Sequence, residues 1–232
     1  MKTTVDNLQV VYEDNHLIVI NKRPGDIVQG DKTGDMPLSE IVKVYLKKKY
    51  NKPGNVFLGV IHRIDRPTSG LVIFARTSKA LTRMNQMLKQ HQINKTYRTI
   101  VKNLPSPANG TLIHYLIKNN KNNKTRAYNQ PVEKGKKAIL HYKHIASSQR
   151  YHLLEIQLET GRPHQIRVQL SKIGCPVKGD LKYGFARSNP NGGISLHAWK
   201  LHFIHPVKKE PVELIAAEPP GDIWKEFNKK KL

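Results

Sequence analysis

A short charged stretch lies between two apolar runs in the first third of the chain. The run from Phe57 to Ile61 precedes it and the run from Leu71 to Ala75 follows it, and each has the length and composition of a buried strand. Between them, Asp65 stands close in sequence to Arg63 and Arg66. Because strands at both ends would fix the backbone, the sequence predicts a rigid loop that holds one carboxylate among arginines.

The residues that follow Asp65 favour a defined loop conformation. Pro67 presets one backbone angle, Gly70 permits conformations that a side chain forbids, and Thr68 and Ser69 can bond nearby backbone groups. Spacing alone leaves two interpretations open. Asp65 is either a turn former whose charge balances the arginines or a carboxylate held in place for chemistry.

The charge of the chain restricts its partners. Its 232 residues include 40 Lys and Arg against 17 Asp and Glu, a formal net charge of +23, which indicates a nucleic acid or an anionic membrane surface. No apolar run approaches the roughly 20 residues of a membrane span, and the first residues lack the apolar core of a signal peptide. A nucleic acid is therefore the favoured partner, and we expect no membrane association.

Strand signals dominate the secondary structure pattern. Apolar segments with turn-rich connections predict two pairs of antiparallel strands, at residues 8–12 with 17–20 and at 138–145 with 151–158. Helices are predicted from Leu38 into the following lysines, after a cap at Thr77 or Ser78, and at 221–227, followed by a frayed basic tail. The balance predicts an α+β fold built on a large mixed, mainly antiparallel sheet with flanking helices.

Two further segments carry recognisable features. Residues 118–126 are basic and without periodicity, which predicts a mobile loop suited to an RNA backbone. In residues 160–174, Pro163 suits the first position of a short helix and Gly174 the residue past its end. His164 and Arg167 lie three residues apart, so we expect them to share a helix face near its positively polarised start.

The order of the motifs resembles one known family. His62-Arg63-Ile64-Asp65 followed by Thr68-Ser69-Gly70 and an apolar strand is similar to the signature of RluA-type pseudouridine synthases, which isomerise uridine in structured RNA. Lys95 and Tyr97, then residues 160–170, and finally the segment that opens at Leu196 resemble later motifs of the same family. The likeness covers nearly the whole chain.

The resemblance implies roles for individual residues. Asp65 would be the essential catalytic carboxylate, acting as a nucleophile or as a base, and Arg167 would pair with it. Tyr97 would stack on the base, with proton transfer as its alternative role. Arg63 would fill the stack vacated by the target base, and Leu196 would pack beneath the reactive nucleotide. Further substrate-binding candidates in the matching motifs are His62, Thr68 and His164.

The resemblance also implies the pseudouridine synthase fold with a central active-site cleft. Only seven residues precede the first predicted strand, so we expect a single catalytic domain over residues 1–232 without an S4-type RNA-binding domain. We expect no cofactor, and no metal because the eleven histidines lack ligand spacing. The lone Cys175 suits a packed thiol in a cytoplasmic protein.

We expect a monomer whose substrate is ribosomal RNA or, in second place, transfer RNA. Two other classes remain open. A non-catalytic RNA-binding or ribosome-assembly protein on the same fold would need the basic surface but not Asp65. A nucleoside-cleaving enzyme would break the glycosidic bond without rejoining the base.

Overall fold

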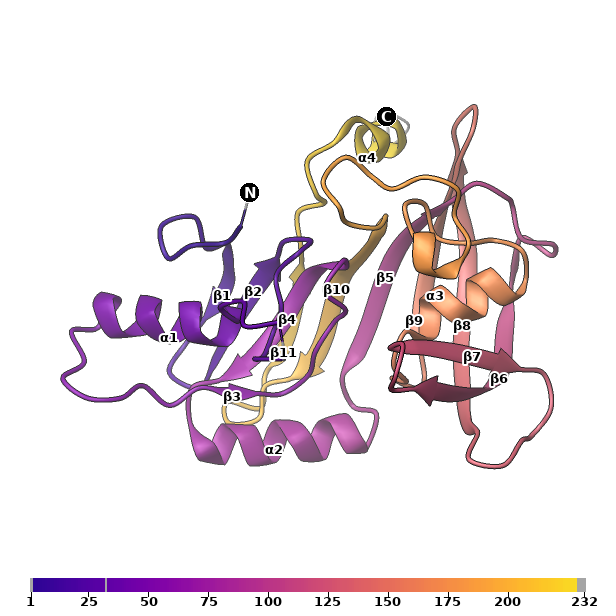
Figure 1. The fold of residues 1–232 in the computed structure, drawn as a ribbon. Helices are drawn as coiled ribbons and strands as arrows, with labels where there is room; N and C mark the ends of the chain where they lie inside the picture. The colour runs from indigo at the N-terminus through magenta and orange to yellow at the C-terminus, as the bar shows by residue number, and fades with distance from the viewer. Residues whose placement is uncertain (1, 32, 229–232) are drawn as a thin grey trace. The chain divides into compact units, whose positions relative to one another are not determined.

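The computed structural model describes residues 2–31 and 33–228, which form two compact units. Unit 1 consists of Met1–Asn94 and Ala198–Glu218, and unit 2 consists of Lys95–His197 and Pro219–Leu232. Figure 1 shows the elements of both units along the chain. Each unit is built mainly of antiparallel strands with a small number of helices.

Unit 1 contains a sheet in the order β1-β2-β4-β10, with β3 beside β4 and β11 beside β10. Its central strands β2 and β4 pair in antiparallel fashion, from Leu17 opposite Ala75 to Lys22 opposite Gly70. The elements are β1 (Val10–Glu13), β2 (Leu17–Lys22), α1 (Leu38–Lys49), β3 (Gly59–Val60), β4 (Ser69–Ala75), α2 (Ser78–Lys89), β10 (Leu196–Ile204) and β11 (Pro211–Ile215).

The central strands of unit 1 are buried along their whole length, which explains their continuous apolar sequences. One face of these strands presents alternate residues such as Val19 and Ile73 to a core that also contains Ala80 and Met84 of α2. Helix α2 begins after Thr77, whose side chain accepts the backbone N–H of Ala80 at 3.2 Å, as expected for a helix cap.

Unit 2 contains a sheet in the order β5-β9-β8-β6-β7, and all the pairs that join these strands are antiparallel. Two clusters of buried apolar residues in its described part contribute to its core. Trp224 and Phe227 of α4 pack with Ile100 and Leu153, and Val168 of α3 packs with Leu116, Ala138 and Tyr183. The elements are β5 (Asn94–Val101), β6 (Asn109–Asn119), β7 (Lys124–Tyr128), β8 (Lys136–Ser147), β9 (His152–Leu158), α3 (Gln165–Lys172), the 3-10 helix η1 (Leu181–Tyr183) and α4 (Asp222–Asn228).

The structure confirms the fold class and most of the predicted elements. The two strand pairs, the helix that runs into Lys47–Lys49, the cap at Thr77 and the last short helix are all present. Cys175 is buried, as expected for a packed thiol. The predicted basic tail falls in residues 229–232, which lie outside the described residues.

Two predictions are wrong in detail. Residues 118–126 are not an irregular loop, because Lys118 and Asn119 end β6 and Lys124 begins β7, and the two strands pair as a hairpin. Helix α3 starts at Gln165, two residues after the predicted start at Pro163, because His164 adopts a left-handed conformation that cannot continue a helix. The predicted end is correct: Gly174 has a φ of 76°, and the N–H of Cys175 reaches the carbonyl of Leu170 at 2.9 Å.

Among the described residues, no helix combines the length and the apolar character that crossing a membrane requires.

Candidate active site

The loop that carries Asp65 connects β3 to β4 in unit 1. A turn fixes it locally, since the N–H of Thr68 donates to the carbonyl of Asp65 at 3.0 Å. A second contact ties it to the segment after β2, where the N–H of Gly25 donates to the carbonyl of Arg66 at 2.8 Å. Ile64 is buried, whereas Asp65 is partly exposed. The loop therefore has a fixed backbone and a carboxylate that remains accessible.

Gly70 is required where the loop enters β4. Its φ is 112°, a value that favours glycine, and an added Cβ would overlap the backbone of Ala198 on β10. Gly70, the second residue of β4, therefore permits the close approach of these two strands beside the Asp65 loop.

A buried lysine lies beneath the same loop. Lys22, at the end of β2, is 1% exposed, and its Nζ donates to the carbonyls of Arg23, Asp26 and Arg66 at 2.9, 2.8 and 3.1 Å. These three acceptors match the three N–H bonds of an ammonium group. Burial lowers the pKa of Lys22 to about 7, although the negative charges of Asp26 and Asp65 act in the opposite direction.

The arginines on either side of Asp65 have different environments. Arg63 is exposed. Arg66 donates from Nη2 to Asp35 Oδ2 at 2.5 Å, and Asp35 also accepts from Lys2 Nζ at 2.9 Å. These ion pairs are solvent-exposed and contribute little to stability. The two arginines nevertheless differ in their contacts, because Arg66 forms an ion pair with Asp35 at the surface of the loop.

The other two predicted residues of this loop face inward to different degrees. His62 accepts the backbone N–H of Ile73 at 3.2 Å through Nε2, so that nitrogen carries no proton in this arrangement. Thr68 is 2% exposed, and within the described part of the chain its hydroxyl oxygen has no hydrogen-bond partner. Thr68 is therefore more enclosed than its assignment to substrate binding suggested.

Two predicted site residues of unit 2 lie on strands: Tyr97 lies within β5, and Leu196 is the first residue of β10. Tyr97 is 8% exposed on β5, opposite Ile156 of β9, and Leu196 is 4% exposed at the first position of β10. The neighbouring Ser195 ties this region to β5, because its carbonyl accepts the N–H of Ile100 at 2.9 Å and the hydroxyl of Thr99 at 3.0 Å. Both predicted side chains are thus buried.

Arg167 of α3 has a partner that the sequence did not indicate. Its Nε and Nη2 donate to the two carboxylate oxygens of Asp180 at 2.6 and 2.9 Å, and the two side chains are 5% and 1% exposed. Such bidentate pairing orients a guanidinium group strongly. The guanidinium carbon also lies 5.0 Å from the centre of the Tyr183 ring.

His164 and Arg167 converge on the same tyrosine. His164 Nδ1 lies 2.8 Å from the hydroxyl of Tyr183, and the two rings meet edge to face at 5.7 Å. The shared helix face predicted from their spacing is replaced by a different arrangement, in which His164 precedes the helix in a left-handed conformation. His164 and Arg167 nevertheless both contact Tyr183.

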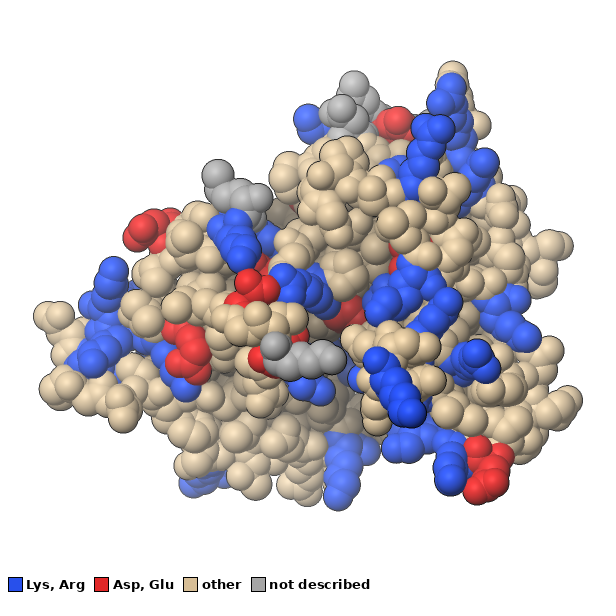
Figure 2. Space-filling model, in the orientation of Figure 1, with Lys and Arg blue, Asp and Glu red and all other residues tan. Residues whose placement is uncertain are grey.

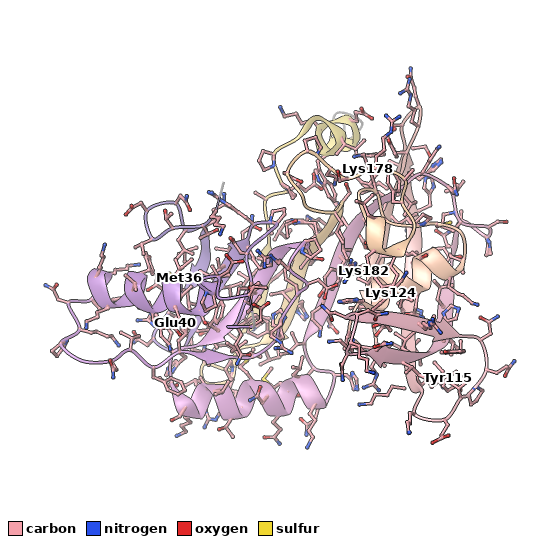
Figure 3. The ribbon with its side chains drawn as sticks, in the orientation of Figure 1. Met36, Glu40, Tyr115, Lys124, Lys178 and Lys182 are labelled. Atoms are coloured by element: carbon pink, nitrogen blue, oxygen red, sulfur yellow. The ribbon has the colours of Figure 1, made fainter. Side chains whose placement is uncertain are left out.

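Exposed cations gather near these residues in unit 2. Figure 2 shows lysine and arginine side chains over the part of the surface that contains β6, β7 and η1, and Figure 3 labels Lys124 and Lys182 there. Lys182 Nζ donates to the carbonyl of Asn123 in the β6–β7 turn at 3.1 Å. Lys124 lies 5.8 Å from the Tyr183 ring centre. A positive surface of this kind suits a phosphate backbone.

Within each unit, the structure brings some of the predicted residues together. His62, Arg63, Asp65 and Thr68 share one loop of unit 1, while His164 and Arg167 share Tyr183 in unit 2. The sequence had predicted no catalytic role for Lys22, Asp180 or Tyr183. The signals were present, since Lys22 precedes a Pro-Gly turn and residues 179–184 begin and end with glycine. No group of three or more potential ligands for a metal ion occurs in residues 2–31 and 33–228.

Comparisons with known proteins identify the family of this chain. A family model described as RNA pseudouridylate synthase matches residues 16–172, a range that includes Asp65, Tyr97 and Arg167. A ribosomal large subunit pseudouridine synthase D from Xylella fastidiosa is 32% identical over 225 residues, which cover 91% of this chain and 66% of that protein. A tRNA pseudouridine synthase C from Pectobacterium carotovorum is 29% identical and is covered over 58% of its length, against 90% of this chain.

A solved structure shares the fold. The human RNA pseudouridylate synthase domain containing 4 superposes with a TM-score of 0.78 at 21% identity, covering 95% of this chain and 92% of that one. The chain spans about two thirds or less of the length of the two bacterial relatives. The similarity therefore concerns the part of those proteins that this chain matches.

Proposed function

Because this chain belongs to the RNA pseudouridylate synthase family, we propose that it isomerises one or more uridines of structured RNA to pseudouridine. The observation that carries the proposal is the Asp65 loop, which combines a fixed backbone with a partly exposed carboxylate. It lies inside the range of the family match. The expected partner is RNA, bound by a monomer in the cytoplasm.

The proposed reaction conserves all atoms of uridine. The bond from the ribose carbon to the ring nitrogen breaks, the uracil turns, and a new bond forms from the same ribose carbon to a ring carbon, whose proton moves to the solvent while the ring nitrogen gains one. No electron donor or acceptor is required. Asp65 would act either as a nucleophile at the sugar or base or as a base that removes a sugar proton.

The target uridine has to leave the RNA stack before Asp65 can reach it. Arg63 is exposed on the Asp65 loop, which supports its assignment to the vacated stack. Tyr97 would stack on the flipped base and Leu196 would pack beneath it. His62, Thr68 and His164 would complete the substrate contacts, and Arg167 would favour the charged form of Asp65.

Ribosomal RNA is the first substrate to test and transfer RNA the second. The Xylella relative is named for the large ribosomal subunit and the Pectobacterium relative for tRNA. Mapping pseudouridines in RNA from cells with and without the gene would identify the modified position. Transcripts that contain this position would then serve as substrates for the purified protein.

The decisive variant is Asp65→Asn, which keeps the shape of the side chain and removes its carboxylate. We expect turnover to fall by a factor of roughly 1,000 or more with RNA affinity retained, because the amide cannot act as nucleophile or base. Glu13→Gln is a matched control on the strand that precedes β2, where Glu13 accepts from Lys49. Near-normal turnover by Asp65→Asn would refute the catalytic assignment.

The two alternative classes give different products. A protein that only binds RNA would leave every uridine unchanged at full occupancy. A nucleoside-cleaving enzyme would release free uracil and leave an abasic site. Chromatography of the reaction mixture separates free uracil, uridine and pseudouridine, so one measurement distinguishes all three activities.

A further inference from the structure

The proposed reaction leaves the segment Gly179–Gly184 of unit 2 without a role, although this segment encloses Arg167. Asp180 accepts both Nε and Nη2 of that arginine, and the two side chains are almost completely buried. A carboxylate that binds one edge of a guanidinium group in this way fixes the plane of the group and its rotation within the plane. Asp180 thus determines the direction in which the remaining Nη1 corner points.

Tyr183 fixes the face of the same guanidinium group. The carbon of the group lies 5.0 Å from the ring centre, within the range of a cation–π contact, and Tyr183 is 4% exposed. The ring itself is held at its hydroxyl, which accepts the N–H of Thr125 on β7 at 2.8 Å. The Tyr183 carbonyl accepts the hydroxyl of Ser171 on α3 at 2.7 Å. One tyrosine therefore joins β7, η1 and α3 around the arginine.

The hydroxyl of Tyr183 has a second function. His164 has a φ of 56°, a left-handed conformation that costs a non-glycine residue of the order of 1–3 kcal/mol. Its contact with the Tyr183 hydroxyl, at 2.8 Å, helps to offset this strain. His164, the residue before α3, and Arg167 of α3 are thus held by one side chain, His164 through the hydroxyl and Arg167 through the ring.

We propose that Asp180 and Tyr183 are positioning residues for uridine isomerisation, and that they act through Arg167 and His164. This inference rests on the proposed function. Because the orientation of the guanidinium group is set when the protein folds, no part of the energy of RNA binding is needed to set it during turnover. Neither residue needs to touch the RNA, so their loss should affect the chemical step more than RNA affinity.

A double-mutant cycle tests the proposal for Asp180. We expect Asp180→Asn to lower kcat about tenfold or more, with RNA affinity changed by less than about threefold. If Asp180 acts through Arg167, the double variant Asp180→Asn/Arg167→Ala should have the kcat of Arg167→Ala alone within about twofold. Effects that multiply, or a normal kcat for Asp180→Asn, would overturn the proposal.

Loss of folded protein is controlled in two ways. All rates are expressed per folded molecule, measured from the unfolding transition of each variant. Glu13 is a carboxylate of unit 1 whose side chain is 9% exposed, and Glu13→Gln provides a control that should reduce stability without changing kcat. If Glu13→Gln lowered kcat per folded molecule as much as Asp180→Asn, the effect at Asp180 would be one of general stability.

A second pair of variants keeps the test decisive if Asp180→Asn does not fold. Tyr183→Phe retains the ring beneath Arg167 and removes the hydroxyl, whereas Tyr183→Leu removes both. We expect Tyr183→Leu to lower kcat by at least about fivefold more than Tyr183→Phe, because only leucine releases the face of the guanidinium group. Equal and small effects of the two changes would overturn the role assigned to the ring.

Failure of this inference can be distinguished from failure of the proposed function. If the unmodified chain forms no pseudouridine on any RNA, the proposed function fails. If it forms pseudouridine and Asp65→Asn does not, while both Asp180→Asn and Tyr183→Leu retain normal kcat, the positioning inference alone fails. NMR offers a readout without RNA: the Arg167 Nε–H, identified by its loss in Arg167→Ala, should exchange slowly and should do so faster in Asp180→Asn.

Discussion

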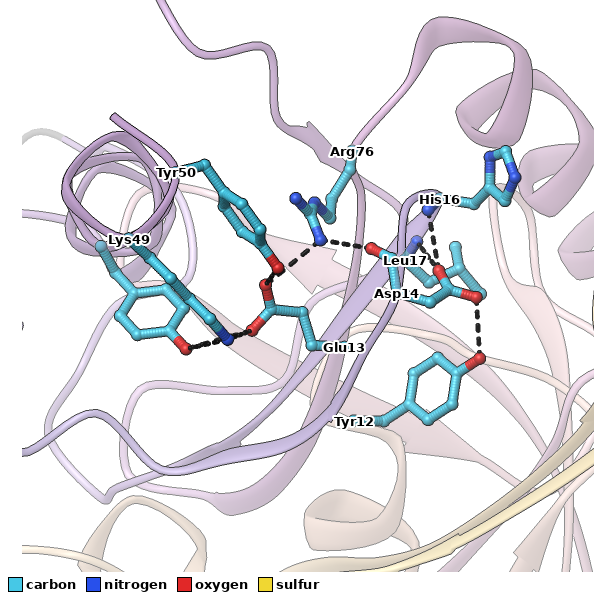
Figure 4. A network of polar contacts seen from close by, with 9 residues as sticks. Tyr12, Glu13, Asp14, His16, Leu17, Lys49, Tyr50 and Arg76 are labelled. Atoms are coloured by element: carbon cyan, nitrogen blue, oxygen red, sulfur yellow. Dashed lines mark hydrogen bonds and ion pairs between the residues drawn. The ribbon is translucent and has the colours of Figure 1, made fainter. Parts of the chain in front are cut away.

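Two carboxylates with little exposed surface, Glu13 in unit 1 and Asp180 in unit 2, differ in how their charge is balanced. Glu13 accepts from the hydroxyls of Tyr45 and Tyr50 at 3.0 and 2.6 Å and from the cations Lys49 and Arg76 at 2.8 and 3.2 Å (Figure 4). Burial raises the pKa of Glu13, but the hydrogen bonds from Lys49, Tyr50 and Tyr45 and the charge of Lys49 outweigh burial, so the net pKa is lowered. Among the described residues, the side chain of Asp180 instead accepts hydrogen bonds only from Arg167.

The Glu13 and Asp180 arrangements suit two different roles of an ion pair. Four donors on Glu13 make the loss of any one of them tolerable, and they tie the end of α1 to β1 and to the residue after β4. Loss of the one bidentate donor on Asp180 would leave that carboxylate without a charged partner among the described residues, but the pairing defines the orientation of a single guanidinium group. The first arrangement suits stability and the second suits a site in which one side chain has to point in one direction.

The largest expected effect comes from removing the cation of each pair. Arg167→Met leaves the carboxylate of Asp180 buried without its donor, so we expect the free energy of unfolding to fall by about 3–5 kcal/mol. Arg76→Met leaves Glu13 with Lys49 and two tyrosines, and we expect a loss of only about 1–2 kcal/mol. Urea unfolding of the two variants measures both values.

A compensating change sharpens this comparison. Adding Asp180→Leu to Arg167→Met removes the orphaned carboxylate, and the double variant should regain at least about 1 kcal/mol relative to Arg167→Met alone. An equal or larger loss for Arg76→Met than for Arg167→Met would show that the number of partners does not decide the cost.

Asp14, the residue after Glu13, should have a smaller effect, which appears as a change of the free energy of unfolding with pH. Asp14 accepts the N–H groups of His16 and Leu17 and the hydroxyl of Tyr12, each at 2.8 Å, and lies 2.9 Å from His205 Nε2 and 3.4 Å from Lys208 Nζ. Burial raises its pKa, but the hydrogen bonds from His16, Leu17 and Tyr12 and the electrostatic effect of His205 outweigh burial and lower the pKa from 3.8 to about 2.

Because the pKa of Asp14 is lower in the folded state, its contribution is fully present above the unfolded value of 3.8 and is lost as the pH falls through about 2. The lowered pKa corresponds to at most about 2 kcal/mol. Asp14→Asn should therefore reduce the free energy of unfolding at pH 5 and have a much smaller effect at pH 2.5. If the variant and the unmodified chain differed equally at both values, the carboxylate charge would not be the source of the stability.

The sequence predicted those parts of the fold that depend on local pattern. The apolar runs of β2 and β4 and the Thr77 cap are properties of neighbouring residues, and the structure confirmed them. The β6–β7 hairpin was missed because Thr125 is the sole buried residue between the exposed Lys118 and Arg126, so the segment has too little alternation to indicate a strand. The two-residue β3 is too short to leave a pattern.

The site was predictable to the extent that it consists of motifs. Asp65 and its loop could be singled out because all their determinants lie within about ten residues. The Arg167–Asp180 pair joins residues 13 positions apart through the return of the chain after α3, and no local rule indicates it. The Lys-Arg-Pro-Gly sequence that begins at Lys22 is typical of a solvated turn or of a phosphate contact. It does not show that three backbone carbonyls surround the ammonium group of Lys22.

The smallest expected effect concerns exposed charges and RNA affinity. About five contacts with single-stranded phosphates would give a log-log salt slope of roughly −3 to −4. Lys121 is exposed in the β6–β7 turn, and Lys121→Ala should lower the magnitude of this slope by less than about one unit. Lys49→Ala should leave the slope unchanged, because Lys49 Nζ is held 2.8 Å from Glu13 and neutralises that carboxylate. Arg63→Ala should also leave it nearly unchanged, since Arg63 is assigned to the emptied base stack.

Affinity measured across a salt series for these three variants separates the roles. The Glu13 network consists of Glu13, Tyr45, Lys49, Tyr50 and Arg76. If Lys49→Ala reduced the slope as much as Lys121→Ala, RNA would contact this network, and the network would not be purely structural. A similar loss in Arg63→Ala would mean that Arg63 contacts a phosphate, and its part in base displacement would have to be abandoned. If Lys121→Ala alone reduces the slope, the hairpin of unit 2 binds the RNA backbone while the Glu13 network of unit 1 serves stability.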